Sequence, residues 1–365
     1  MATLTLATAI SLAGRDMAWL RQQAGDGAQL VQAQTVNYGI SVQDAEHICL
    51  KLMKEYLERY SQEAFEVAGK RVEEFAVNFL TELNKQAPEA ISNLKDPGVQ
   101  SAVLDAEVGF AKSGDEQLGE VLVEMLVART LETERNVKQL ALNEGIAVAQ
   151  RLTSKHLAAL SLLFFFKNVQ VNPPTAEDFK ERVKALLPPM CADFRSFTES
   201  DSQYLVATGC AVRSIGTISW QSIMKQRYPG LYHRGFRPEE TPSMDEILNG
   251  LENPGAAAIL FESAEDGFFK VNAISEEGAR VIGSTVGLTE NAPLLELMKH
   301  NPIPDVEITD SVKRDIPELL DFLEAWSTLG FDGLDVSLTG IAVAYANFKR
   351  LTKEAFNAKI DVWIS

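Results

Sequence analysis

The chain has few of the residues on which common metal and redox sites depend. Its 365 residues include three cysteines and four histidines. The cysteines, Cys49, Cys191 and Cys210, are far apart and odd in number, which argues against a disulfide framework or a zinc knuckle. No two histidines have the spacing of metal ligands. The sequence therefore predicts no metal, no cofactor and a reducing cytoplasm as the location.

Clusters of positive charge and long apolar runs are also missing. The formal net charge is -17, and such a field repels nucleic acids and anionic membranes. The longest apolar run, residues 157–166, is too short to span a bilayer. Residues 4–13 are apolar but lack the basic start of a signal peptide. We expect a soluble protein with no membrane span that binds no nucleic acid.

Catalytic motifs are absent as well. The chain has neither a G-x-S-x-G elbow nor a phosphate-binding loop. Cys210 lies between glycines in an apolar run, where a cysteine usually acts as a small buried hydrophobe. The sequence favours a protein that is not an enzyme.

Helical periodicity dominates what is present. Ser41 and Asp44 have the spacing of a capping box, and apolar residues then recur at steps of three and four from Ala45 to Leu83. Since no proline intervenes before Pro88, the pattern predicts one very long helix over about 41–86, about 65 Å in length. Gly69 is its candidate bend. The spacing is typical of a coiled-coil or bundle seam, which requires partners along the whole helix.

The rest of the chain predicts four segments and a mostly α fold. Further helices are expected to complete a bundle around the long helix, and Asn172-Pro173-Pro174 is the predicted end of that bundle. Thr153 or Ser154 and, further on, Thr175 are expected to cap helices. The C-terminal part is expected to be α+β, with a small sheet of three strands over 268–274, 334–338 and 360–364. The predicted segments are a helical extension (1–24), an isolated strand (25–39), a helical bundle (40–172) and the α+β domain (173–365).

The segment from Gly25 to Gly39 breaks the helical pattern. It is a short, Gln- and Val-containing run between glycines, and an isolated strand must pair to satisfy its backbone. One alternative is pairing with another copy of the chain, for which the candidate residues are Leu30, Val31, Gln32, Val36 and Asn37. The other is pairing within the chain, with Leu334–Leu338 or Ile360–Ile364.

One loop is a candidate ligand site. Of the four histidines, His47, His156 and His300 occupy helical positions typical of structural roles. His233 instead lies in a loop rich in aromatic and basic residues, between positions 228 and 236. Tyr232, His233 and Arg234 are therefore candidate residues of a small-molecule or peptide pocket, with a surface loop as the alternative.

The run from Gln29 to Gly39 resembles a bacterial signature in which Gln-Ala is followed by Val-Asn-x-Gly. The signature is associated with uncharacterised helical proteins known by locus names. The spacing around Leu118-Gly119, Leu157 to Leu160, and Leu338-Thr339-Gly340 with Trp363-Ile364 is similar to the same family, over residues 25–365. The resemblance implies no activity and no catalytic residues. More loosely, the strand resembles amyloid-signalling motifs of bacterial immune proteins, and the C-terminal end resembles abortive-infection proteins.

Three functions remain open on these grounds. The first is a non-enzymatic assembly or signalling protein of a bacterial cytoplasm, involved in phage defence, that forms homo-oligomers through the 28–38 strand and the long helix and has a possible protein partner. The second is an enzyme or ligand sensor with a pocket near 228–236. The third is a structural protein whose strand pairs within the chain.

Overall fold

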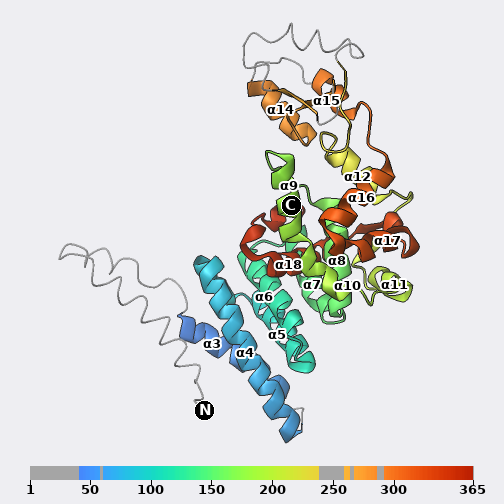
Figure 1. The fold of residues 1–365 in the computed structure, drawn as a ribbon. Helices are drawn as coiled ribbons and strands as arrows, with labels where there is room; N and C mark the ends of the chain where they lie inside the picture. Colours follow the sequence, from blue (N-terminus) through green and yellow to red (C-terminus); the bar gives the residue numbers. More distant parts are fainter. Residues whose placement is uncertain (1–40, 58–60, 238–258, 264–266, 286–291, 365) are drawn as a thin grey trace, which may run out of the picture. The chain divides into compact units, whose positions relative to one another are not determined.

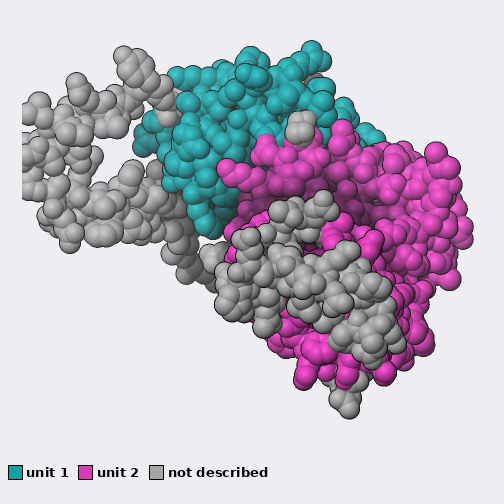
Figure 2. All heavy atoms as spheres, turned by 90° about the horizontal axis from the view of Figure 1, so that it is seen from above, with its two compact units in different colours: residues 1–151, 365 teal, residues 152–364 magenta. Residues whose placement is uncertain are grey.

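The structure is a computed structural model that describes residues 41–57, 61–237, 259–263, 267–285 and 292–364 (Figure 1). The fold is mostly α-helical, and the described strands form two small two-stranded sheets. The predicted extension (1–24) and the predicted strand (25–39) lie outside the described residues. The chain divides into two compact units, residues 1–151 with 365 and residues 152–364 (Figure 2).

Unit 1 is a helical bundle. Its described helices are α3 (Val42–Leu57), α4 (Gln62–Gln86), the 3₁₀ helix η1 (Pro88–Lys95), α5 (Pro97–Ser113), α6 (Glu116–Leu131) and α7 (Val137–Ala149). Helix α4 contacts α3, α5 and α6, while α7 packs on α6 and α5. Asp96, Asp115 and Asn136 cap α5, α6 and α7, each accepting a backbone N–H three residues ahead, as N-cap side chains do.

The prediction of one very long helix is wrong in one respect: the described residues form two helices that pack together. Ser61, in an extended conformation, precedes α4 as its N-cap residue. Leu50 of α3 packs against a cluster that contains Ala68 and Val72. On one continuous helix Leu50 and Ala68 would lie about 27 Å apart, so α3 must fold back along α4. The capping box at Ser41 and Asp44 is confirmed: Asp44 N donates to Ser41 Oγ and Ser41 N donates to Asp44 Oδ2, each at 3.1 Å.

Unit 2 is built around α8 (Ser154–Asn168), whose side chains are almost all buried. Helices α10 (Pro188–Phe194) and α18 (Leu338–Thr352) pack against it. The buried Asn347 of α18 donates to Ser161 Oγ at 2.8 Å. The other helices of this unit are α9 (Ala176–Leu186), α11 (Glu199–Ala207), α12 (Trp220–Arg227), α14 (Glu276–Thr285), α15 (Ala292–Lys299), α16 (Asp305–Asp315), α17 (Leu320–Thr328) and the short 3₁₀ turns η4 (Pro317–Leu319), η5 (Phe331–Gly333), η6 (Lys353–Ala355) and η7 (Ile360–Val362).

The sheet differs from the predicted three-stranded one. Strand β1 (Ala211–Arg213) pairs antiparallel with β4 (Leu334–Val336), and β2 (Leu260–Glu262) pairs antiparallel with β3 (Phe269–Val271). The strands predicted near 268–274 and 334–338 are therefore present, in different sheets. The third predicted strand is wrong, because residues 360–362 form the 3₁₀ helix η7.

The boundary between the two units falls between residues 151 and 152 of the sequence. The predicted end of the bundle is at residue 172. Helix α8 lies between these positions and packs with α10 and α18 of unit 2. Asn172-Pro173-Pro174 is a non-helical connection inside unit 2, between α8 and α9.

Candidate functional site

The five residues predicted to carry self-association, Leu30, Val31, Gln32, Val36 and Asn37, lie outside the described residues. In the sequence, only Ile40 and Ser41 separate Gly39 from the start of α3, a helix of unit 1.

The three predicted pocket residues are held in different surroundings. Residues 232–234 pair with a segment near Pro302: Arg234 N donates to Asn301 O at 3.0 Å, and Ile303 N donates to Tyr232 O at 2.9 Å. The His233 side chain is buried. The Arg234 guanidinium forms an ion pair with Glu307. The Arg234 side chain is therefore engaged in the fold, and His233 is enclosed by it.

Tyr232 does line a cavity. Its volume is about 130 Å³, and its walls come from α8, α9, α12, α16 and α17 together with the loop that carries Leu231 and Tyr232. Lys180 and Asp315, which also line the cavity, form an ion pair at 3.2 Å. The remaining lining is largely apolar. The volume is below the range of about 300–1,000 Å³ that drug-sized ligands occupy, so the cavity suits only a small apolar molecule.

A polar row at the start of α8 escaped the sequence patterns. His156 Nδ1 accepts the Thr153 backbone N–H at 3.1 Å and lies 2.8 Å from Thr153 Oγ1. His156 Nε2 lies 3.0 Å from Asp201 Oδ1, and Asp201 Oδ2 accepts from Lys155 Nζ at 2.8 Å. Burial lowers the pKa of His156, and Asp201 opposes that effect.

Thr153, His156 and Asp201 are arranged as a helix cap and not as a catalytic triad. A hydroxyl, an imidazole and a carboxylate in sequence are the parts of a nucleophile and its base. Here, however, Nδ1 already accepts the Thr153 amide, and Thr153 with His156 forms the capping box of α8. The Thr-x-x-His spacing is the only local signal, because Asp201 comes from a helix 45 residues further along the chain from His156.

The cysteines are poor nucleophiles. All three are buried, free thiols. Burial raises the pKa of the Cys191 thiol to about 12 and raises the pKa values of Cys49 and Cys210 as well. Because the thiolate is the reactive form, such cysteines are inert at neutral pH. Within the described ranges, no three His, Cys, Asp or Glu side chains are placed to hold a metal ion.

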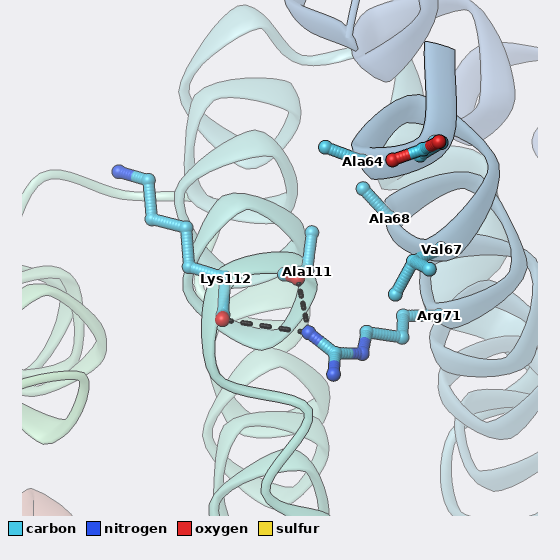
Figure 3. Close-up of a pocket in the computed structure, with 7 residues that line it drawn as sticks. Ala64, Val67, Ala68, Arg71, Ala111 and Lys112 are labelled. Atoms are coloured by element: carbon cyan, nitrogen blue, oxygen red, sulfur yellow. Dashed lines mark hydrogen bonds between the residues drawn. The ribbon is translucent and has the colours of Figure 1, made fainter. Parts of the chain in front are cut away.

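A surface groove of about 410 Å³ lies on unit 1 (Figure 3). It is lined by residues of α4 and by the C-terminal end of α5: Glu63, Ala64, Val67, Ala68, Arg71, Ala111 and Lys112. Arg71 crosses it and donates through Nη1 to Ala111 O at 2.8 Å and to Lys112 O at 3.4 Å. These are terminal carbonyls of α5, which arginine side chains often satisfy. Arg71 therefore joins α4 to α5 at the edge of the groove.

The groove combines charged edges with an apolar surface. Val67 is 52% exposed, whereas the neighbouring Ala68 is buried. Glu63 lies one turn before Val67, and Arg71 lies one turn after it. The sequence pattern gives Val67 no role, because this residue falls outside the apolar seam of the predicted long helix.

No described helix combines the length and the apolar character that crossing a membrane would require. Comparison with curated proteins and with solved structures gives no significant match. By contrast, the model of an uncharacterised family, named by locus, matches residues 39–364. This match covers far more than half of the chain, from just before α3 to the last described residue. The chain therefore belongs to this locus-named family.

Proposed function

We propose that this protein is a non-enzymatic assembly or signalling protein that self-associates through residues 28–38 and the α3–α4 hairpin. The proposal places it in a bacterial cytoplasm, in phage defence. The phage-defence role rests on the similarity of the 28–38 run to amyloid-signalling motifs. The cytoplasmic location is supported by three buried cysteines, none of which forms a disulfide, as expected in a reducing compartment.

The observation that carries the proposal is the apolar groove on α4. An exposed apolar side chain beside a groove on a helix is a place where a facing helix can dock. The groove belongs to the same unit as α3, the helix that follows residues 28–38 closely in the sequence. An uncharged Gln- and Val-containing strand and an exposed helical groove would act together, since two weak contacts between the same molecules reinforce each other.

The strand is tested with proline. Val31→Pro and Val36→Pro remove backbone donors and fix φ, so neither residue can take part in a strand ladder. We expect each variant to lower the native mass measured by light scattering. The matched controls are Val31→Ile and Val36→Ile, which keep the β-branched side chain and should keep the wild-type mass. An oligomer of unchanged mass in both proline variants would show that the strand has no part in assembly.

A ligand sensor is the second candidate function, favoured by the cavity at Tyr232. Small apolar probes occupy largely apolar cavities of this size class. Benzene should then raise the melting temperature of the wild-type protein. It should have no such effect on Val312→Phe, which fills part of the cavity. Equal responses of both proteins would exclude the cavity as a binding site.

A further inference from the structure

The groove on α4 has the geometry of a hole in a helix–helix interface. Ala64, Val67, Ala68 and Arg71 lie at positions i, i+3, i+4 and i+7 of one helix. Four residues with this spacing form the hole that receives one side chain of a facing helix. Ala64 and Ala68 leave room at this position because they are small, and Ala111 of α5 also lines the groove. The exposed Val67 is itself suited to be the inserted side chain.

The charges around Val67 are self-complementary in one orientation. Glu63, Val67 and Arg71 are separated by four residues each and therefore share one helix face. If a second α4 crosses antiparallel, with a two-fold axis beside Val67, the Glu63 carboxylate of each copy lies opposite Arg71 of the other. A parallel arrangement would bring Glu63 against Glu63 and Arg71 against Arg71. Only the antiparallel pair gains two attractive contacts.

Arg71 is positioned for this second role. Its Nη1 is fixed on the α5 carbonyls of Ala111 and Lys112, so the guanidinium is ordered before any partner arrives. A guanidinium has five N–H donors in a planar fork. Nη1 is used on α5, while Nε and Nη2 lie close to Gly114 at the same end of the groove. Lys112 extends away from the guanidinium in Figure 3, so it does not compete for the same carboxylate.

We propose that the partner of this groove is a second copy of the chain, with α4 packed antiparallel on α4 and each Val67 inserted into the hole of the other. This proposal rests on the proposed self-association and adds its geometry. A single crossing of two helices falls at the small end of protein interfaces, below about 1,200 Å². The contact is therefore weak by itself and depends on concentration, as expected for one of two contacts that reinforce each other.

A residue beside a two-fold axis lies next to the same residue of the second chain. The antiparallel contact therefore predicts that the two Val67 residues are neighbours, which cross-linking can test directly. Val67→Cys places two thiols within reach of a disulfide, which needs Cα atoms about 4.4–6.8 Å apart. Mild oxidation of the full-length variant should give a covalent dimer on a non-reducing gel. The native cysteines are buried and should contribute none. The control is Val281→Cys, at a similarly exposed valine of α14, which should stay monomeric on the gel.

A charge variant supplies the second measurement. Val67→Glu puts two carboxylates at the axis and should raise the dimer dissociation constant at least about 10-fold by sedimentation equilibrium. Because Val67 is half exposed, this change should leave the melting temperature within a few degrees of wild type. Glu63→Gln removes both attractive contacts between Glu63 and Arg71 of the other copy. It should weaken the dimer by about 3-fold.

The outcomes separate this inference from the proposed function. An oligomer whose mass is unchanged by Val67→Glu, and which is not cross-linked by Val67→Cys, would overturn the α4 contact and leave self-association standing. A wild-type chain that is monomeric at every concentration would overturn both. A monomer in which the introduced thiol is shielded from thiol reagents would also overturn the α4 contact, since another part of the same chain would then fill the groove.

Discussion

At the scale of single residues, two buried histidines and one aspartate of unit 2 have shifted pKa values for different reasons. His233 and His156 are buried bases, and burial lowers the pKa of each. Asp201 is the opposite case: partial burial raises its pKa, but hydrogen bonds from Lys155 and Thr198 outweigh this and lower the pKa to about 2. The native state therefore favours neutral imidazoles and an ionised Asp201, and acid acts against all three.

His233 should make the protein sensitive to mild acid. Burial and the nearby Lys270 lower its pKa from 6.5 to about 4. Since the unfolded chain takes up the proton first, the contribution of His233 to stability is complete above pH 6.5 and is lost as the pH falls towards 4. By pH 5 the loss amounts to about 2 kcal/mol. Urea unfolding at pH 7.5 and pH 5 measures it.

The variant His233→Leu should lose about 2 kcal/mol less than wild type between these two pH values, because the side chain no longer titrates. The matched control is His47→Gln, which replaces an exposed histidine of α3. If His233→Leu and wild type lost the same free energy, His233 would not titrate on unfolding, and the burial seen here would have no energetic effect.

The start of α8 gives a second residue-scale prediction. Asp201 accepts from Thr198 N at 2.8 Å and from Thr198 Oγ1 at 2.7 Å, in addition to Lys155. Asp201→Asn should lower the free energy of unfolding by about 2 kcal/mol, since hydrogen bonds to a charged acceptor are lost. Glu199→Gln, on the exposed side of the same helix, is the control and should change it by less than about 0.5 kcal/mol. Equal effects would contradict the role given to Asp201.

Caps were predictable from sequence because their partners are three residues apart. The Ser41–Asp44 box is present, and Thr175 accepts from Asp178 N at 3.1 Å as expected. The partner of His156 was not predictable, because Asp201 reaches it only through the packing of α11 on α8. The same holds for the burial of His233, which depends on the segment near Pro302.

At the scale of elements, the α3–α4 hairpin shows where periodicity misleads. The apolar spacing continues from Tyr56 to Ala64 across the interruption, and no proline or glycine marks it. Ser61 ahead of Glu63 is the only local sign of a new helix start, and it is weak. Gly69, the predicted bend, lies inside α4. Helix content was therefore predictable, whereas the reversal of direction was set by packing on α5.

A distance measurement distinguishes the two arrangements. Spin labels at His47 and Glu73, both exposed positions, would lie about 40 Å apart on one continuous helix. In the hairpin they should lie less than about 25 Å apart, since packed helices have axes about 8–10 Å apart. Double electron–electron resonance resolves this difference. A distribution centred near 40 Å would restore the single long helix.

The junction of β1 and α18 tolerates no side chain at Gly340. A Cβ there would lie 1.9 Å from the Cys210 carbonyl oxygen, a backbone atom that also accepts from Ser337 N at 3.1 Å. Gly340→Ala should therefore lower the free energy of unfolding by about 2 kcal/mol or more. Gly216→Ala, where a Cβ meets nothing within 4 Å, is the matched control and should cost less than about 0.5 kcal/mol. Similar costs would contradict this packing.

At the scale of the whole molecule, the sequence predicted the fold class, but it did not predict where the chain divides into two units. Periodicity and composition predict a mostly α protein with little sheet, and the structure confirms this. The proline pair at 173–174 predicts a break in helix, which is present, but a break in helix is not a domain boundary. Helix α8 is apolar on every side, so it serves as the core of the unit that surrounds it, and that unit begins at residue 152.

At the candidate site, too, local sequence predicted some residues and packing decided the rest. The sequence directed attention to Tyr232, His233 and Arg234, because aromatic and basic residues clustered in a loop. Of these, Tyr232 lines a cavity, while His233 and Arg234 are engaged in the fold. The groove around Val67 could not be predicted, since it requires the end of α5 beside α4, and that contact joins positions about 40 residues apart.

The account depends most on whether the chain associates with itself, and the native mass of the full-length protein as a function of concentration measures this directly. Sedimentation velocity across a hundredfold dilution should give a mass of at least twice 40.1 kDa at high concentration. On dilution the mass should fall towards the monomer, as expected for two weak contacts that reinforce each other. A constant mass of 40.1 kDa at every concentration would contradict the proposed assembly function.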